Sequence, residues 1–292
     1  MKEVGVLCAE AFSNQVNKGN PAGIVFDANW ISYNEMQSIS NRIGFNETVF
    51  ILESKVADIR LRYFTPNHEM NLCGHGTVAS ICELMSRNNI KNSKSLSIET
   101  LAGILKVYYD NYLHEVTMEQ SPAKFRMFNG DIEKLASSIG INIADIDDKY
   151  PIVYGSTGTW TILIPIKHIE TFKNMKPNNK EFSGVLKEIP TSSVHPFSLE
   201  TIYPNNDMHG RHFSATHSGT VEDPITGTAS GVMGAYYIKY IKDVNNIKLR
   251  IEQGQEIGKD GLVKASAAII DNKIEVSISG TSIFIEEKIL KI

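Results

Sequence analysis

Two stretches of the chain place apolar residues three or four positions apart, the spacing that lines one face of an α-helix. In the first half these positions are Val78, Ile81, Cys82 and Met85. In the second half they are Met233, Tyr236, Tyr237 and Tyr240. Each stretch directly follows a glycine turn, at residues 74–76 and 226–228. The pattern therefore predicts two helices that begin in the same way.

Most other apolar residues lie in short β-branched or alternating runs, which are typical of strands. In the first half we expect strands at residues 4–12, 24–26, 47–52, 58–65, 96–100, 103–109 and 115–119. In the second half we expect them at 152–154, 160–166, 193–204, 211–215, 248–252, 262–270, 273–279 and 282–287. Residues 19–23 predict a turn. Ser32 and Glu35 form a capping box that opens a further helix, which Gly44 closes, and residues 178–187 favour a short one.

Similar segments precede the two predicted helices. Each has an arginine in a strand, a phenylalanine two residues later, and a glutamate five residues before the glycine of the turn. These residues are Arg62, Phe64, Glu69 and Gly74 in the first half, and Arg211, Phe213, Glu222 and Gly227 in the second. The connecting loops differ by four residues, which surface loops absorb easily. The agreement favours internal duplication over a chance match of two turns.

Composition narrows the class of protein. The 292 residues are 42% hydrophobic and 21% charged, with a net charge of −4, as is ordinary for a globular protein. Lysine and arginine are scattered, so neither nucleic acid nor an anionic membrane is expected as a partner. No apolar run is long enough to span a bilayer, so no membrane span is expected. Glu10 interrupts the short apolar run near the start, so no signal peptide is expected. Three cysteines cannot form a disulfide framework, and at least one of them stays unpaired. This favours a reducing compartment, the cytoplasm.

The two glycine turns are candidate sites for an anion. A helix that starts at Gly74 or Gly227 offers unpaired backbone N–H groups and the positive end of its dipole. Such a terminus binds carboxylates or phosphates well. The alternative is that each glycine only permits a tight turn. Because the turns form a matched pair, we expect them to hold a small anionic molecule.

Cys73 and His75 flank the first of these glycines. A cysteine beside a histidine suggests a thiolate nucleophile or base, although most free cysteines are simply small buried side chains. Thr226 occupies the matching place in the second half. Racemisation by two bases needs a proton carrier on each face of the carbon, and threonine is a poor one. A standard two-cysteine epimerase is therefore not expected.

Carboxylates are the other candidate proton carriers. Glu47 opens a predicted strand, and Asp223, like Glu69 and Glu222, lies in a loop before a glycine turn. A carboxylate in an apolar cleft can accept and return a proton, whereas the alternative for each is a solvated surface position. Histidines 209, 212 and 217 do not predict zinc, because 209 and 212 would point to opposite faces of a strand. Motifs for phosphate loops, dinucleotides and serine hydrolases are absent.

Five motifs together resemble the PhzF family of phenazine-biosynthesis-like proteins, a branch of the diaminopimelate-epimerase-like fold. The resemblance covers nearly the whole chain. The motifs are Gly19-Asn-Pro-Ala-Gly23, Asn46-Glu-Thr-Val-Phe50, Arg62-Tyr-Phe-Thr-Pro66, Leu72-Cys-Gly-His-Gly-Thr77 and Glu222-Asp-Pro-Ile-Thr-Gly-Thr-Ala229.

The resemblance implies an α+β fold of two pseudo-symmetric domains, each a curled, mostly antiparallel sheet around a central helix. The expected division is residues 1–118 with 280–292, and residues 119–279. The family's active site lies in the cleft between its two domains and uses neither cofactor nor metal. The implied substrate is a small carboxylic acid, and the resemblance is compatible with a homodimer.

Roles for single residues follow from the same resemblance. In the family's isomerase the glutamate matching Glu47 shuttles a proton between carbons on one face of a cyclic dienol acid. His75 and Asp223 match further catalytic residues. The implied substrate-binding residues are Asn20, Cys73, Gly74, Gly227 and Thr228.

Two alternatives stay open. Cys73-Gly-His-Gly is similar to the Cys-Gly-Asn-Gly motif of the epimerases, so a Cys73-dependent epimerase or racemase of an amino acid is one of them. The other is a non-catalytic module that binds a small molecule, since no motif specifies a substrate.

Overall fold

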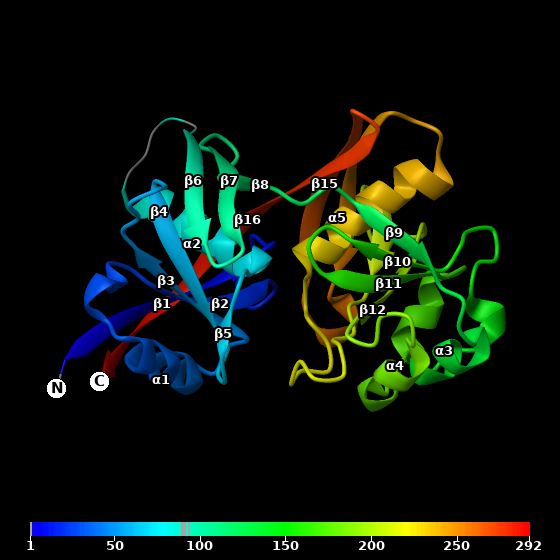
Figure 1. Cartoon of the computed structure of the whole chain (residues 1–292), viewed down its shortest axis with the longest axis horizontal. Coiled ribbons are helices and arrows are strands. Elements are labelled where there is room, and N and C mark those ends of the chain that lie inside the picture. The colour runs from blue at the N-terminus through cyan, green and yellow to red at the C-terminus, as the bar shows by residue number, and fades with distance from the viewer. Residues whose placement is uncertain (1, 89–91, 93) are drawn as a thin grey trace. The chain divides into compact units, whose positions relative to one another are not determined.

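The chain divides into two compact units, each combining a set of strands with a largely buried helix (Figure 1). The computed structural model describes residues 2–88, 92 and 94–292. Unit 1 consists of Met1–Glu119 and Ser279–Ile292, and unit 2 consists of Gln120–Ile278. Strands predominate and helices are interspersed among them, so the expected α+β class is confirmed.

Eight strands of unit 1 close into a ring. In ring order they are β1 (Glu3–Ala11), β2 (Asn20–Val25), β3 (Glu47–Leu52), β4 (Ile59–Phe64), β6 (Lys94–Thr100), β7 (Gly103–Asp110), β8 (Glu115–Glu119) and the end of β16 (Lys273–Lys291). β16 returns to β1 in antiparallel register, from Glu3 opposite Lys291 to Ala11 opposite Ser282. Closure leaves no free edge in the ring. The short β5 (Glu69–Met70) adds to β4.

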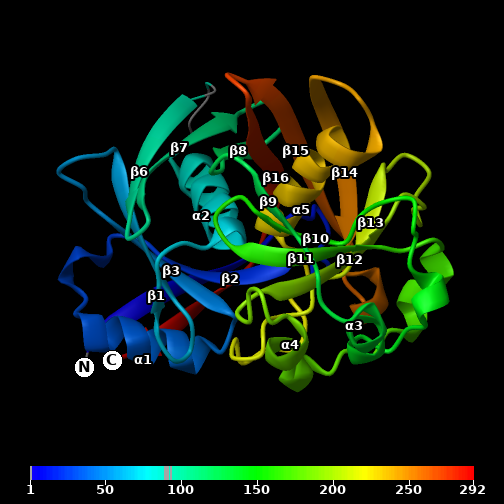
Figure 2. The same cartoon turned by 45° about the vertical axis from the view of Figure 1, so that its right-hand side comes forward.

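Helix α2 (Gly74–Arg87) is enclosed by this ring, where it contacts β1, β2, β3, β7 and β8 (Figure 2). Its apolar spacing predicts one buried face, yet Thr77 and Ser80 are buried as well. Enclosure by strands explains this, because a helix surrounded by protein has no solvent face. Helix α1 (Tyr33–Ile43) packs on β3 and β4, and its predicted capping box and left-handed Gly44 (φ 74°) are confirmed.

Unit 2 holds a second set of strands. They are β9 (Lys124–Met127), β10 (Val153–Ser156), β11 (Trp160–Pro165), β12 (Ser193–Ser198), β13 (Met208–Gly210), β14 (Asn246–Gln253), β15 (Gly261–Ile270) and the start of β16. Helix α5 (Gly227–Tyr236) packs on β10, β14 and β15 and continues as a π-helical turn over Tyr237–Ile241. Two short helices, α3 (Ile132–Ser138) and α4 (Asn179–Val185), pack against each other.

The two units pair their strands in the same order. From β1 to β7 the successive pairings are antiparallel, parallel, antiparallel, parallel and antiparallel. From β10 to β15 the succession is identical. The helix that packs against the strands follows the fourth strand of each series, as α2 follows β4 and α5 follows β13.

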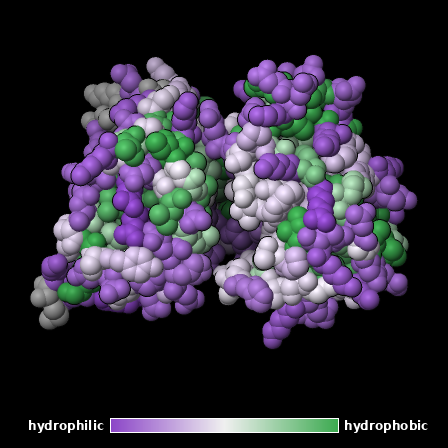
Figure 3. All heavy atoms as spheres, in the orientation of Figure 1, coloured by the Kyte–Doolittle hydropathy of each residue, from purple (hydrophilic) through white to green (hydrophobic). Residues whose placement is uncertain are grey.

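On the face that Figure 3 shows, hydrophilic residues predominate and hydrophobic residues gather into small separate patches. Among the residues that the structure describes, no helix is long and apolar enough to cross a membrane.

Several predicted elements are wrong in detail. The expected turn at 19–23 is largely strand β2, because Asn20–Gly23 pairs with β1 and its last residues also pair with β3. The expected strands at 273–279 and 282–287 form one strand, β16. Gly280 does not interrupt it but makes room for Phe12, whose Cδ1 lies 2.2 Å from the position of a Cβ at residue 280.

The region between β12 and α5 departs most from expectation. β12 ends at Ser198 instead of residue 204, and the next strand is β13 rather than residues 211–215. Phe213 makes only isolated bridges, to Val194 and Glu222. β9 and α3 were not predicted, because their short lengths give little periodicity.

Candidate functional site

Three candidate residues meet in unit 1. Glu47 opens β3, Cys73 is the N-cap of α2, and His75 is the second residue of that helix. Nε2 of His75 lies 3.1 Å from Oε2 of Glu47. The Cys73 sulfur lies 3.5 Å from Nδ1 and 3.8 Å from Nε2 of the same imidazole. The imidazole therefore contacts both the carboxylate and the thiol.

The start of α2 is shaped by Cys73 and Gly76. Cys73 is extended (φ −137°, ψ 120°), and its sulfur accepts the Gly76 N–H at 3.3 Å, which satisfies one of the free donors at the helix start. A Cβ on Gly76 would lie 2.8 Å from Cγ2 of Val49 in β3. Glycine is needed here so that the helix can approach β3 and bring His75 to Glu47.

Burial and charge set the protonation of this cluster. Cys73 is 6% exposed and His75 is 7% exposed. Burial, together with the negative charge of Glu47, raises the pKa of the Cys73 thiol, so the thiol is protonated at neutral pH. Burial acts to lower the pKa of His75, but the hydrogen-bond contacts of its ring with the Cys73 sulfur and the Glu47 carboxylate, together with the negative charge of Glu47, outweigh burial and raise that pKa above its usual range. The imidazole is therefore an imidazolium beside the carboxylate at neutral pH.

A buried hydrogen-bond chain holds the turn in place. The hydroxyl of Tyr63, on β4, lies 2.7 Å from Oγ1 of Thr77, which donates to the Cys73 carbonyl at 2.7 Å. Tyr63 and Thr77 are fully buried. No motif in the sequence marks this support, because Tyr63 has the pattern of an ordinary inward-facing strand residue.

Asn20 and Gly74 also belong to unit 1. Asn20 is the first residue of β2 and is fully buried. Ala22 pairs with Glu47 in the parallel β2–β3 register, and side chains two residues apart on a strand share a face. Asn20 therefore projects from the same face of the sheet as Glu47. Gly74 is the first residue of α2, where its N–H is one of the free donors.

The remaining candidates lie in unit 2 at the start of α5. Thr226 is the N-cap, Gly227 is the first helical residue and Thr228 is the second. The Thr226 hydroxyl donates to Oδ2 of Asp223 at 2.5 Å, and the Thr228 carbonyl accepts from Oγ1 of Thr157 at 3.3 Å. The Asp223 carboxylate is thus held at the positive end of the helix.

Gln253, at the end of β14, stabilises this turn with two hydrogen bonds. Its side-chain N–H₂ donates to the Asp223 carbonyl at 2.8 Å, and its side-chain oxygen accepts the Thr226 N–H at 3.2 Å. Gln253 is almost completely buried. The sequence did not predict this role, because 27 residues separate Gln253 from Thr226 and no local pattern marks it.

The two loop glutamates have structural partners. Glu69 makes a two-pronged pair with Arg62 at 2.7 and 2.8 Å. Glu222 pairs with Arg211 in the same way, at 2.9 and 2.6 Å. Such forked pairs fix geometry as well as charge. Their carboxylates are therefore engaged in holding the loops before α2 and α5.

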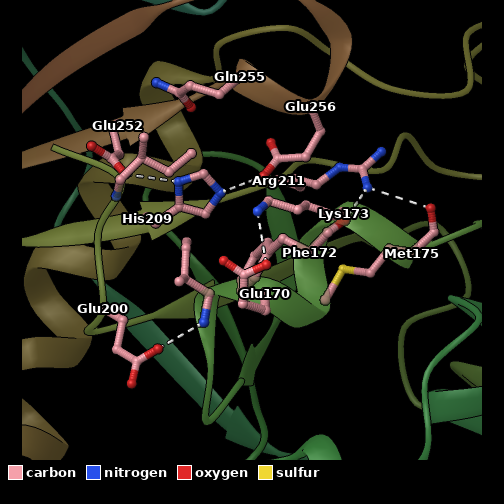
Figure 4. Close-up of polar contacts among 12 residues, drawn as sticks. Glu170, Phe172, Lys173, Met175, Glu200, His209, Arg211, Glu252, Gln255 and Glu256 are labelled. Atoms are coloured by element: carbon pink, nitrogen blue, oxygen red, sulfur yellow. Dashed lines mark hydrogen bonds and ion pairs between the residues drawn. The ribbon is translucent and has the colours of Figure 1, made fainter.

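The histidines of unit 2 also have partners within the protein. His209 is fully buried between Glu252 and Glu256, each 3.0 Å from one ring nitrogen (Figure 4). His195 and His212 are buried with their Nδ1 atoms 3.2 Å apart. The two histidines of the 209–212 pair thus serve different clusters, and His217 is exposed.

Comparison with known proteins decides the family. The model of the phenazine biosynthesis-like protein family, PhzC-PhzF, matches residues 9–288. The chain belongs to this family. It is 50% identical to the uncharacterised isomerase YfhB of Bacillus subtilis over 295 residues, covering all of both chains. It is 25% identical over 280 residues, 94% of each chain, to the trans-2,3-dihydro-3-hydroxyanthranilate isomerase of Pseudomonas chlororaphis.

Solved structures agree with this membership. A PhzF-family phenazine biosynthesis protein of Bacillus anthracis is 48% identical, with a TM-score of 0.97 over all of both chains. A hydroxyproline epimerase of Agrobacterium vitis, 10% identical, shares the fold alone, with a TM-score of 0.65 over 99% of this chain and 91% of that one. The resemblance to PhzF proteins is confirmed, as are the epimerase-like fold and the assignment as an isomerase of the PhzF family.

Proposed function

We propose that this PhzF-family protein is a cofactor-independent isomerase that moves a proton on a small carboxylic acid, with Glu47 as general acid and base. The observation that carries the proposal is the Glu47 carboxylate at the end of a strand, 3.1 Å from the buried imidazole of His75. The Pseudomonas chlororaphis relative, named as an isomerase of a cyclic amino acid, supports a cyclic acid as substrate class.

The proposed reaction uses one proton carrier twice. Glu47 removes a proton from one carbon of the substrate, and the electron pair spreads over the conjugated acid. The protonated Glu47 then returns the proton to another carbon on the same face, so that charge and atoms balance. The His75 imidazolium lowers the energy of the Glu47 carboxylate between turnovers, because opposite charges in a desolvated site attract strongly.

Backbone N–H groups supply the proposed hold on the substrate carboxylate. Gly74 opens α2 immediately beside the Glu47–His75 pair, so an acid bound at this helix start lies next to the base. In unit 2, Gly227 and Thr228 open α5 in the same manner, and Asp223 lies at that helix start. We assign these residues to substrate binding and Asp223 to the catalytic set, as the family motif implies.

A second candidate is a Cys73-dependent epimerase or racemase. The contact between the Cys73 sulfur and His75 favours it, and so does the fold shared with a hydroxyproline epimerase. Two observations weigh against it. The pKa of the thiol is raised, and threonine is the N-cap of α5 where cysteine is the N-cap of α2. The third candidate is a non-catalytic module that binds a small molecule.

The test is proton exchange in D₂O with trans-2,3-dihydro-3-hydroxyanthranilate as probe. We expect the wild type to incorporate deuterium during turnover and Glu47→Gln to lose about 10²–10⁴-fold in rate, the usual contribution of a positioned acid–base group. Glu53→Gln is the matched control, because Glu53 is an exposed carboxylate beyond the other end of β3. It should keep the wild-type rate.

The possible outcomes distinguish the Glu47-dependent isomerase, the Cys73-dependent epimerase and the binding module. Exchange that persists in Glu47→Gln would rule out Glu47 as the base. If the wild type turns over neither this probe nor related cyclic acids, thermal shifts with the same acids decide whether the protein only binds them, since a ligand of the folded state raises Tm.

A further inference from the structure

The contact of Glu47, Cys73 and His75 has a second chemical property besides proton transfer. Among the residues that the structure describes, these three form the one group of at least three histidine, cysteine or carboxylate side chains whose donor atoms all lie within 4.8 Å of one another. Carboxylate oxygen, imidazole nitrogen and thiolate sulfur are the ligands that zinc takes in proteins.

Two of the three separations between donor atoms are close to those around a tetrahedral zinc ion, and the third, from sulfur to carboxylate oxygen, is within 4.8 Å. With Zn–S of about 2.3 Å and Zn–N and Zn–O of about 2.1 Å, tetrahedral angles place sulfur and nitrogen about 3.6 Å apart and nitrogen and oxygen about 3.4 Å apart. The sulfur of Cys73 lies 3.8 Å from Nε2 of His75, and that nitrogen lies 3.1 Å from Oε2 of Glu47. Shifts of a few tenths of an ångström would reach the ideal values.

Charge also fits a divalent cation. When a metal binds, Cys73 and His75 each release a proton to solvent and Glu47 stays a carboxylate. A thiolate and a carboxylate then balance the two positive charges of the metal in a buried place. The Gly76 N–H already points at the sulfur and would support the thiolate. The helix start lies beside the donors, so a fourth ligand from solvent or a bound acid can complete the coordination.

We propose that Glu47, Cys73 and His75 form an inhibitory zinc site. A bound Zn²⁺ occupies the carboxylate that would otherwise carry the substrate proton, so the metal-bound protein is inactive and the metal-free protein is the active form. The inhibition rests on the proposed function, whereas the metal binding does not. The thiol next to the base thus makes the active site sensitive to soft divalent cations and leaves it insensitive to Mg²⁺, which prefers oxygen ligands.

The binding test uses the full chain after treatment with a chelator, with Co²⁺ as a coloured substitute for Zn²⁺. We expect a thiolate-to-cobalt charge-transfer band, and d–d bands of tetrahedral intensity, that Zn²⁺ bleaches and Mg²⁺ does not. Competition between the two metals gives the zinc affinity.

Variants assign the ligands. Cys73→Ser should abolish the charge-transfer band, and Glu47→Gln should keep it while zinc affinity falls at least about 100-fold, since even indirect partners of metal ligands are worth 10–100-fold. Cys82→Ser is the matched control, because Cys82 is a second buried thiol on α2 whose sulfur contacts the His114 carbonyl at 3.8 Å. It should bind cobalt like the wild type.

Several results would overturn the assignment. These are the absence of a band in the wild type, a band that survives Cys73→Ser, or a band lost in Cys82→Ser. Circular dichroism confirms that each variant is folded, and Cys73→Ala replaces Cys73→Ser if the latter is not.

Measuring activity in the presence of zinc distinguishes failure of the metal site from failure of the proposed function. Zn²⁺ should inhibit exchange at the concentration at which it binds, and a chelator should restore the rate. A chelator-treated enzyme that is active but binds no zinc overturns the inference alone. Zinc binding in a protein without isomerase activity overturns the proposed function and leaves the metal site in place.

Discussion

At the scale of single residues, the chemistry depends on which of three adjacent groups carries the proton. The carboxylate of Glu47 and the imidazole of His75 form an ion pair, because the pKa of His75 is raised well above its usual range. The Cys73 thiol, whose pKa is raised, stays protonated under the same conditions. The thiol therefore accepts a hydrogen bond from the Gly76 N–H and is not the base of the proposed reaction.

Replacing Cys73 by serine therefore has a limited expected effect on the reaction. We expect kcat to fall less than about tenfold, against the 10²–10⁴-fold expected for the loss of a general base. The measurement is the exchange rate and its pH profile in Cys73→Ser beside Glu47→Gln. A loss in Cys73→Ser as large as that in Glu47→Gln would support the epimerase-like reading instead.

At the scale of elements, each principal helix is anchored by the strand and loop that precede it. The Arg62–Glu69 and Arg211–Glu222 pairs tie each strand region to the loop before α2 or α5. Arg211 also donates to the Phe172 and Met175 carbonyls (Figure 4). The loops that carry the candidate residues are therefore held by largely desolvated ion pairs within the protein.

Strand β12 and the segment after β13 carry a titrating pair of histidines. Burial lowers the pKa of His212 to about 4, and it lowers that of His195 well below its usual range. The unfolded chain binds these protons at a pKa of about 6.5. Between about pH 6.5 and 4 the unfolded state therefore holds more protons than the folded state, so stability falls as pH falls.

We predict that His212 alone lowers the free energy of unfolding by about 3 kcal/mol between pH 6.5 and 4, since each pKa unit is worth about 1.4 kcal/mol. His212→Gln should flatten the dependence over this range. Urea unfolding at several pH values, wild type against variant, measures it. An equally steep loss in the variant would show that other groups cause it.

At the scale of the whole molecule, one structural plan is used twice with different chemistry. The order of parallel and antiparallel pairings recurs in both units, and so do the arginine–glutamate pair and the helix that opens at a glycine. We infer an internal duplication. The residues at the helix starts have diverged, since Cys73 and His75 correspond to Thr226 and Thr228, and β12 opens with Ser193 where β3 opens with Glu47.

Strand β16 contributes residues to both units, and Gly280 lies just after the boundary. Gly280→Ala should destabilise the protein by about 1–3 kcal/mol, because the new Cβ would lie 2.2 Å from the Phe12 ring and overpack it. Gly184→Ala in α4 is the control. Apart from its chain neighbours and its own helix backbone, no atom lies within 4 Å of its Cβ position, and alanine favours a helix by about 0.5–1 kcal/mol. Chemical unfolding compares them. Equal effects would contradict the crowding at Phe12.

Local pattern determined a large part of the fold. The expected strand bounds at 47–52 and 115–119 agree with β3 and β8. Helix α1 begins at the Ser32 capping box and ends at Gly44, as expected. These features depend on neighbours within a few residues, which the sequence displays directly. The family motifs pointed in the same way to Glu47, His75 and the two glycine turns.

Tertiary structure alone decided what depends on contacts between distant segments. Pairing with β1 and β3 made a strand of the Gly19–Gly23 region, and packing on Phe12 allowed β16 to continue through Gly280. The support that Tyr63 and Gln253 give to the two helix starts crosses 14 and 27 residues. The contact of Glu47 with His75 spans β3 and α2, and it raises the pKa of His75. Burial and proximity arise only when the chain is packed, and they set the protonation states on which the proposed chemistry depends.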